Sequence, residues 1–172
     1  VEVINEDGTS GLGLAPAGAS MGTREAVELR DGGPQFKGLG VQRALEGIAG
    51  EIAPALAGQD VTRQAEIDAL LVALDGTPLK SRLGGNALVA TSLAVLHAAA
   101  AHARVPLWQY LAQSRPVQLP LPQVQVFGGG AHAGRRVDIQ DFMVIATGAR
   151  SFSEAMEMTA EVYRAAGQIM AA

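Results

Sequence analysis

The chain has 172 residues, of which 48% are hydrophobic and 17% charged, with a formal net charge of −4. This size predicts one domain or slightly more, with ample core material, and the mildly negative charge argues against non-specific nucleic-acid binding, which needs a positive field. No run of about eighteen uninterrupted apolar residues is present, so no membrane span is expected, and the absence of cysteine excludes disulfides, thiolate metal sites and cysteine nucleophiles.

The first forty residues predict a hairpin and a long loop. Two extended runs, residues 1–4 and 9–15, flank the turn signal Asp7-Gly8, which is typical of a β-hairpin. A loop then runs from Pro16 to Gly40, and loops of this length are usually functional or disordered. Its glycines could let backbone groups close on a phosphate or a metal ion. A solvated loop with alternating charges explains the same residues equally well.

Four helical segments follow the loop. Apolar residues at steps of three and four predict a helix over residues 41–56, which Pro54 is expected to kink or end, and a second helix over residues 67–74. An alanine-rich helix is expected over residues 84–103, and its small residues predict close packing on neighbouring elements. A short capping turn or helix is expected at residues 107–111.

Three prolines in SRPVQLPLP, residues 114–122, mark the best candidate for a domain boundary. Beyond it the pattern predicts a strand at residues 122–127, a second strand at residues 136–146, and a helix that begins with the capping-box sequence at residues 151–154. The second part is therefore predicted to be β-β-α. The apolar face of its helix is expected to contain Phe152, Ala155, Thr159, Val162, Ala166 and Ile169.

The glycine run at residues 128–130 leads into Ala131-His132-Ala133, which fits a relaxed form of the dinucleotide-binding fingerprint. That motif needs a helix directly after the glycines to hold a pyrophosphate. Because a strand is expected here, dinucleotide binding is disfavoured. Two interpretations remain: a glycine-rich hairpin connection with a solvated histidine, or a ligand site in which His132 converges with Gln140 and Asp141 of the next strand.

Five stretches together resemble the enolase (phosphopyruvate hydratase) family nearly from end to end. They are GASMGTREAVELRD at 18–31, residues 51–87, SLAVLHAAAA at 92–101, GGAHAGRRVDIQDFM at 129–143 and GARSFSEAMEMTAEVY at 148–163. The resemblance implies an α+β capping domain, residues 1–113, followed at residues 114–172 by the first β-β-α of an incomplete TIM-like α/β barrel. A complete barrel has eight strands and about 250 residues. Both ends of the sequence have the pattern of interrupted elements, so we expect it to be a piece of a longer protein.

The resemblance implies a glycolytic lyase reaction, the dehydration of 2-phosphoglycerate to phosphoenolpyruvate, assisted by two Mg²⁺ ions. In this family a barrel lysine removes the proton from carbon 2, and the metal ions stabilise the charge that develops. The lysine and the metal carboxylates are expected after Ala172, so the chain alone is expected to be inactive. A cytoplasmic homodimer that binds a small-molecule substrate, without nucleic-acid or membrane partners, is implied as well.

Four residues of the sequence match functional positions of the family. Ser20 matches the loop serine that closes over the site and contributes to the second magnesium. His132 matches the substrate-facing histidine of the GGxHA motif, and Gln140 matches the substrate-contacting glutamine of the QEFM motif. Asp141 stands where that motif has its catalytic-site glutamate.

The sequence departs from the family pattern close to these positions. Asp141 is one methylene shorter than glutamate, and misplacing a reacting group by about 1 Å can cost on the order of a hundredfold in rate. Gly128 replaces an asparagine, and Ala17, Met21 and Leu39 replace a serine, a threonine and a lysine in or near the closing loop. Three interpretations follow: an enolase, a paralogue acting on another carboxylate substrate, or a non-catalytic truncated copy that serves as an interaction module.

Overall fold

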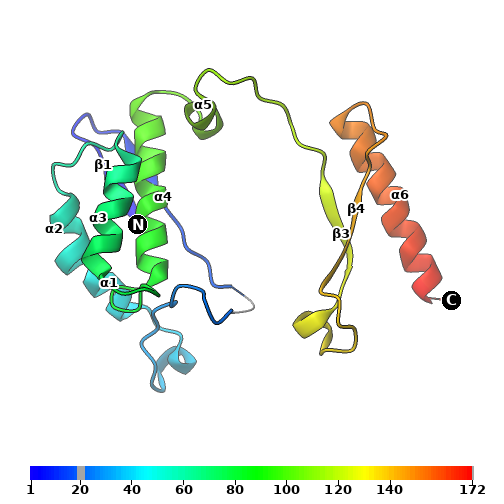
Figure 1. Cartoon of the computed structure of the whole chain (residues 1–172), viewed down its shortest axis with the longest axis horizontal. Helices are drawn as coiled ribbons and strands as arrows, with labels where there is room; N and C mark the ends of the chain where they lie inside the picture. The colour runs from blue at the N-terminus through cyan, green and yellow to red at the C-terminus, as the bar shows by residue number, and fades with distance from the viewer. Residues whose placement is uncertain (19–21, 172) are drawn as a thin grey trace. The chain divides into compact units, whose positions relative to one another are not determined.

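The computed structural model describes residues 1–18 and 22–171, except for the side chain of His132. The chain divides into two compact units, Val1–Ser114 and Arg115–Ala172. The first unit combines a β-hairpin with helices, and the second is an open β-β-α arrangement (Figure 1). This is the α+β cap and partial barrel that the sequence predicts. Within the described ranges, no helix is long and apolar enough to cross a membrane.

The N-terminal hairpin pairs β1 (Glu2–Ile4) with β2 (Ser10–Leu12) in antiparallel register. Its turn is closed by Asp7, whose carboxylate accepts hydrogen bonds from the Thr9 hydroxyl at 2.6 Å and from the Thr9 N–H at 2.9 Å. These bonds, together with His102 Nδ1 at 2.8 Å, lower the pKa of Asp7 to about 2. The predicted hairpin is confirmed, and Gly8 has the positive φ of 82° that its turn requires.

The alanine-rich helix α4 (Gly85–His102) lies at the centre of the first unit. β2 lies directly against it: a Cβ added to Gly11 would lie 2.1 Å from the Ala98 nitrogen, and one added to Gly13 would lie 1.9 Å from the Ala90 oxygen. Ala98 is fully buried at this contact. Small residues on both elements therefore let the two backbones touch, which confirms the close packing predicted for this helix.

Residues 42–56 follow one helical path with a change of pitch. Helix α1 (Gln42–Gly47) leads into a π-helical turn, η2 (Ile48–Ile52), and then into α2 (Ala53–Leu56). Pro54 has no N–H to donate to the preceding turn, and the wider π turn lies immediately before it. From the sequence, Pro54 is expected to kink or end the helix. The structure shows instead a local change of helix type before Pro54, and the helix continues through it to Leu56.

The remaining helices of the first unit complete its core. Helix α3 (Gln64–Asp75) packs beside α4 and ends at Gly76, which has a left-handed φ of 71°. Helix α5 (Leu107–Ala112) follows α4, and a 3-10 turn, η1 (Gln35–Gly38), lies in the described part of the long loop. The buried core residues are Leu29, Ala44, Ile52, Ile67, Leu71, Leu83, Ala87, Leu88 and Val95.

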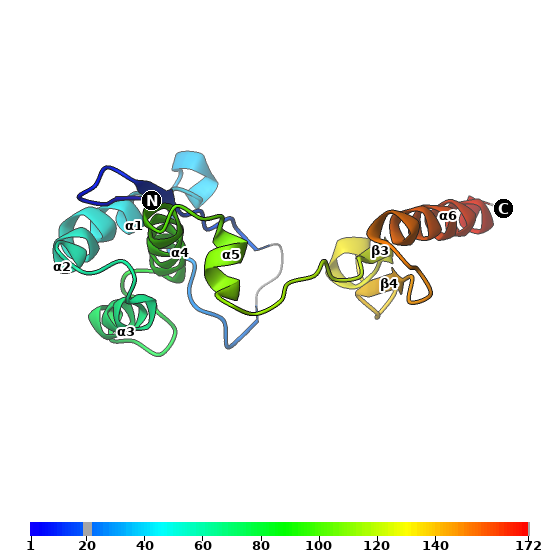
Figure 2. The ribbon, with the colours of Figure 1, turned by 90° about the horizontal axis from the view of Figure 1, so that it is seen from above.

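In the second unit, β3 (Gln123–Gly128) pairs antiparallel with β4 (Asp141–Ile145), and α6 (Phe152–Ala171) packs along this hairpin (Figure 2). Ser151 caps α6 as predicted, since its hydroxyl accepts a hydrogen bond from the Glu154 N–H at 3.1 Å. In a regular capping box the Glu154 carboxylate would accept a hydrogen bond from the N–H of the cap residue, Ser151. Here it accepts from the N–H of the preceding residue, Arg150, at 2.7 Å.

Two details of the second unit differ from the prediction. The second strand begins only at Asp141, not near residue 136, because residues 136–138 bend and the Val137 and Gln140 oxygens accept hydrogen bonds from the glycine run, outside the regular strand pairing. On the predicted apolar face of α6, Ala155 and Thr159 are buried, whereas Ile169 is 78% exposed. Burial of that face is therefore confined to its Ala155 and Thr159 positions.

Candidate functional site

The glycine run after β3 folds back on the segment that precedes β4. The Gly129 N–H donates to the Gln140 oxygen and the Gly130 N–H donates to the Val137 oxygen, both at 2.7 Å. A Cβ on Gly129 would lie 2.0 Å from the Ile139 oxygen, so no side chain fits there. Close backbone approach thus requires glycine at 129, and it holds the start of β4 beside the glycine run.

His132 lies in η3 (Gly130–Ala133), a single 3-10 turn that follows the glycine run. This four-residue turn is not the helix that a dinucleotide-binding fingerprint requires. The His132 side chain lies outside the described part of the structure, and so does Ser20 of the long loop. The functional roles expected for these two residues therefore stay predictions.

Two side-chain amides hold the exposed carboxylate of Asp141, the first residue of β4. Gln125 Nε2, on β3, donates to Asp141 Oδ1 at 2.7 Å, and Gln140 Nε2 donates to Oδ2 at 3.3 Å. A carboxylate with an N–H donor on each oxygen is held in a defined orientation. The structure thus brings Gln140 and Asp141 together with Gln125, a residue that the sequence did not single out.

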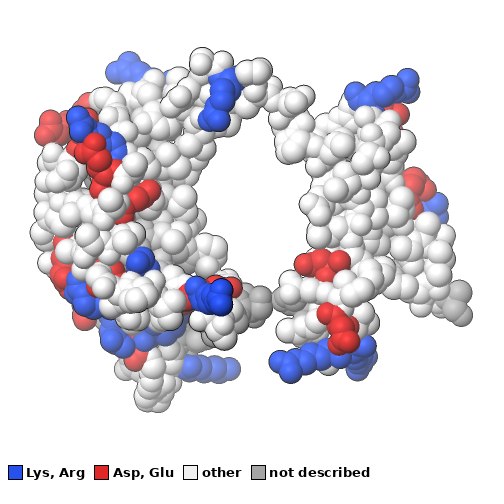
Figure 3. Space-filling view, in the orientation of Figure 1, with Lys and Arg blue, Asp and Glu red and all other residues white. Residues whose placement is uncertain are grey.

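Charged side chains surround the turn between β3 and β4. Arg135, Arg136 and Asp138 are exposed there, and Figure 3 shows both positive and negative side chains at this end of the hairpin. The exposed arginines at this turn suit an anionic small molecule, while the nearby acids keep the field from becoming strongly positive.

In the first unit, the start of α4 anchors the long loop. Asn86 Oδ1 accepts a hydrogen bond from the Leu29 N–H at 3.0 Å, and Asn86 Nδ2 donates to the Leu29 oxygen at 3.1 Å. The Val27 N–H donates to the Leu79 oxygen, and the Val27 oxygen accepts from the Gly85 N–H, both at 2.7 Å. Residues 27–29 are therefore held at the edge of the core by four hydrogen bonds.

Asp31 connects the far end of this loop to α1. Its carboxylate accepts hydrogen bonds from the Arg43 N–H at 2.9 Å and from the Gln42 N–H at 2.8 Å. These bonds hold the pKa of Asp31 below its ordinary value. Val41 at the N-cap position makes no side-chain hydrogen bond, so Asp31, a residue remote in sequence, caps the helix in its place. A Cβ on Gly40 would lie 2.2 Å from Asp31 Oδ2, so glycine leaves room for this cap.

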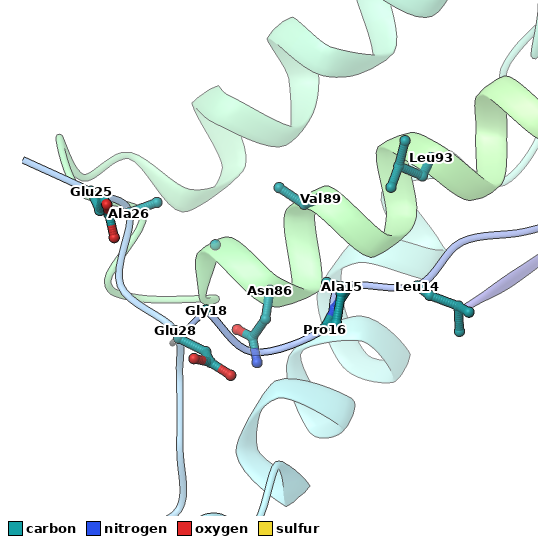
Figure 4. Close-up of a pocket in the computed structure, with 11 residues that line it drawn as sticks. Leu14, Ala15, Pro16, Gly18, Glu25, Ala26, Glu28, Asn86, Val89 and Leu93 are labelled. Carbon is teal, nitrogen blue, oxygen red and sulfur yellow. The ribbon is translucent and has the colours of Figure 1, made fainter. Parts of the chain in front are cut away.

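A pocket of about 340 Å³ lies between the loop and α4 (Figure 4). Its walls are mostly apolar, with two carboxylates on the loop side. One of them, Glu28, is paired with Arg30. The lining residues are Leu14, Ala15, Pro16, Gly18, Glu25, Ala26, Glu28, Gly85, Asn86, Val89 and Leu93. The pocket therefore offers apolar volume beside the loop, with few groups free to bind an anion.

Asp75 is a buried carboxylate with a structural role. Only 2% of the residue is exposed, and its side chain accepts hydrogen bonds from the N–H groups of Leu83 at 2.8 Å, Thr77 at 3.0 Å and Arg82 at 3.1 Å. Burial by itself raises the pKa of Asp75, but these bonds outweigh it and leave the pKa below its ordinary value. Asp75 thus organises the turn that leads into α4.

The described residues do not form a magnesium site of their own. In residues 1–18 and 22–171, no three His, Asp or Glu side chains lie close enough together to hold a metal ion. Mg²⁺ takes oxygen ligands in near-octahedral geometry, whereas the neighbours of the Asp141 carboxylate are amide N–H groups. The donor set present here therefore does not fit a complete Mg²⁺ site.

Comparison with known proteins connects both units to one family. Residues 1–111 match the enolase N-terminal domain, and residues 116–172 match the enolase C-terminal TIM barrel domain. The chain belongs to the enolase family. Its hairpin-and-helix first unit is accordingly an enolase cap, and its β-β-α second unit is the start of an enolase barrel.

Three enolases illustrate the similarity. The enolase of Aeropyrum pernix is 54% identical over 156 residues, which cover 91% of this chain and 36% of that protein. Enolase 1 of Desulfitobacterium hafniense is 50% identical over 169 residues, which cover 98% and 39%. The enolase of Methanocaldococcus jannaschii is 48% identical over 163 residues, which cover 95% and 38%. The chain therefore spans less than two fifths of the length of these enolases.

Three residues of this enolase segment organise its loop and hairpin in ways that the sequence analysis did not assign to them. Asn86 follows two glycines at the start of a helix, a position where its side-chain bonds could have been expected. Asp31 lies far from α1 in the sequence, so no local capping pattern reveals it. Gln125 reads as an ordinary polar residue of an alternating strand, and only the observed strand register shows its contact with Asp141.

Proposed function

We propose that the full-length protein containing this chain is an enolase, a lyase that dehydrates 2-phosphoglycerate to phosphoenolpyruvate in glycolysis with two Mg²⁺ ions. The observation that carries the proposal is an identity of 48% to 54% with proteins named enolase, over more than nine tenths of this chain. The proposal includes a homodimeric, cytoplasmic enzyme, as the family resemblance implies.

The proposal gives the second unit, Arg115–Ala172, the role of opening the barrel. Gly128 is the last residue of β3 and Asp141 is the first residue of β4, so both lie at the carboxyl end of β3. TIM barrels build their active sites at the carboxyl ends of strands. The position of Asp141 and its neighbours on the hairpin therefore agrees with a place in the active site.

Within this site, each residue is assigned a separate task. Asp141 takes the position of the catalytic-site acid, and the two amides on its oxygens orient it. Gln140 and His132 contact the substrate, and Ser20 contributes to the second magnesium. Since the donor set of the described residues does not fit Mg²⁺, the proposal assigns the metal carboxylates and the lysine base to the part of the enzyme that this chain does not span.

The test is a kinetic comparison in the full-length protein. The wild type is expected to convert 2-phosphoglycerate to phosphoenolpyruvate in the presence of Mg²⁺. His132→Ala is expected to lower kcat/KM by about a hundredfold, the usual cost of losing one polar group aimed at the reacting substrate. Gln123→Ala, an exposed residue on β3, is the matched control. A wild type without turnover refutes the proposed function, and an unimpaired His132→Ala variant refutes the assignment of His132.

A paralogue that acts on a different carboxylate substrate is the second candidate. Two observations favour it: Asp141 is shorter than the family's glutamate, and Gly128 replaces an asparagine beside it in the hairpin. A folded full-length protein that leaves 2-phosphoglycerate unchanged but turns over another small carboxylate, and loses that activity in His132→Ala, is the result expected of the paralogue.

A further inference from the structure

Gln125 reaches Asp141 because the hairpin contains a β-bulge. Gln125 is opposite Met143, whereas Phe127 is opposite Phe142 and Gly128 is opposite Asp141. Val126 is therefore an extra residue on β3. In a regular strand, residues three apart point to opposite faces, but a bulge re-aims the side chains on one side of it. Since Asp141 and Met143 share a face of β4, Gln125 and Gly128 share the facing side of β3.

Because Gly128 has no side chain, the Gln125 amide can lie directly beside it. A Cβ at position 128 would lie 2.9 Å from Gln125 Nε2, closer than such atoms normally approach. Gly128 is not among the residues with positive φ, so its backbone conformation does not require glycine. The Gln125 amide is therefore the group that a side chain at position 128 would meet first, and this amide would have to move by roughly 0.5 Å to reach ordinary contact distance.

We propose that Gln125 is a positioning residue that orients the Asp141 carboxylate, and that the bulge at Val126 and the glycine at 128 make this contact possible. The inference rests on the proposed function, because it takes Asp141 to lie in the active site. It also connects the two departures from the family pattern that face each other in the hairpin. A shortened acid has less reach, and an amide from the neighbouring strand holds it in one orientation.

The first test is kinetic and uses the full-length protein with 2-phosphoglycerate and Mg²⁺. Gln125→Ala is expected to lower kcat about tenfold with little change in KM, because a hydrogen bond to a charged group is lost while the substrate contacts stay. Gln123→Ala lies on the same exposed face of β3 and is expected to behave as wild type. A wild-type kcat for Gln125→Ala overturns the inference.

Side-chain length supplies a rescue experiment. Gln125→Asn shortens the donor by one methylene, so the amide no longer reaches Asp141 and kcat is expected to fall. Adding Asp141→Glu lengthens the acceptor by one methylene and restores the span, so the double variant is expected to regain most of the lost kcat. A double variant as impaired as the more impaired single variant contradicts a positioning contact.

The second test is structural and separates the inference from the proposed function. In crystals of the full-length Gly128→Ala variant, the added methyl is expected to displace the Gln125 amide from Asp141 with the hairpin backbone unchanged. Gly148→Ala is the control, since a Cβ there meets nothing within 4 Å. If Gln125 still binds Asp141 in Gly128→Ala, the inference is wrong even in an active enzyme. If the wild type is inactive and only Gly128→Ala shows the displacement, the proposed function fails and the contact stands.

Discussion

Gly129→Ala tests the geometry of the glycine run directly. The added Cβ would lie 2.0 Å from the Ile139 oxygen and 3.0 Å from the Val137 oxygen. Ordinary van der Waals contact begins at 3.4 Å, so the Ile139 carbonyl has to retreat by roughly 1.4 Å. That movement stretches the 2.7 Å hydrogen bond between the Gly129 N–H and the Gln140 oxygen. Gln140 and the adjoining Asp141 are then carried away from their positions.

The size of the effect follows from this displacement. A shift of about 1 Å in a reacting group costs on the order of a hundredfold in rate, so we expect kcat/KM for 2-phosphoglycerate to fall about a hundredfold in the full-length Gly129→Ala variant. The lost hydrogen bond and the overpacking are expected to reduce the free energy of unfolding by about 1–3 kcal/mol. Gly148→Ala, with open space around its Cβ, is expected to match wild type in both assays. A Gly129→Ala enzyme within about threefold of wild type would refute the reasoning, because a shift of 1 Å would then be harmless.

Four further outcomes are expected. Asp75→Ala leaves three backbone N–H groups without their acceptor, so urea unfolding of the chain should show a free energy of unfolding lower by about 3–5 kcal/mol. The exposed Glu46→Ala control should stay within about 0.5 kcal/mol of wild type. Equal losses in the two variants would contradict the structural role of Asp75. Because the pKa of Asp75 is below its ordinary value in the folded chain, its contribution is complete above about pH 4 and is lost as pH falls through the folded-state pKa. Unfolding measured from pH 5 downward should therefore show a smaller acid-induced loss in Asp75→Asn than in wild type, and parallel curves would rule this out. Asn86→Ala should speed amide exchange at Leu29 about tenfold without changing exchange in the middle of α4, and unchanged protection at Leu29 would mean that the other anchors suffice. The 172-residue chain alone should not turn over 2-phosphoglycerate above a blank containing only metal, and turnover above that blank would show that it needs no further carboxylates or base.

Local signals in the sequence were enough for most elements of the fold. The turn signal Asp7-Gly8 predicted the hairpin because the Asp7 side chain closes its own turn through Thr9. The capping box predicted the start of α6 because Ser151 bonds to an N–H three residues away. Where the prediction was wrong, at the start of β4, apolar alternation over residues 136–140 suggested a strand. The chain bends at residues 136–138 instead, and the Val137 and Gln140 oxygens are bound by backbone N–H groups of the glycine run, a contact between segments that alternation does not reveal.

The family and the order of the elements could be predicted from the sequence alone, because motifs and local hydrogen-bonding patterns involve consecutive residues. The residues that surround Asp141 and those that hold the long loop became visible only in the folded chain. Gln125 reaches Asp141 through a strand register with one extra residue, and Asp31 reaches α1 across the loop. Both contacts join residues more than ten positions apart, so their existence depends on how the backbone closes in space and leaves no periodic or local pattern to read.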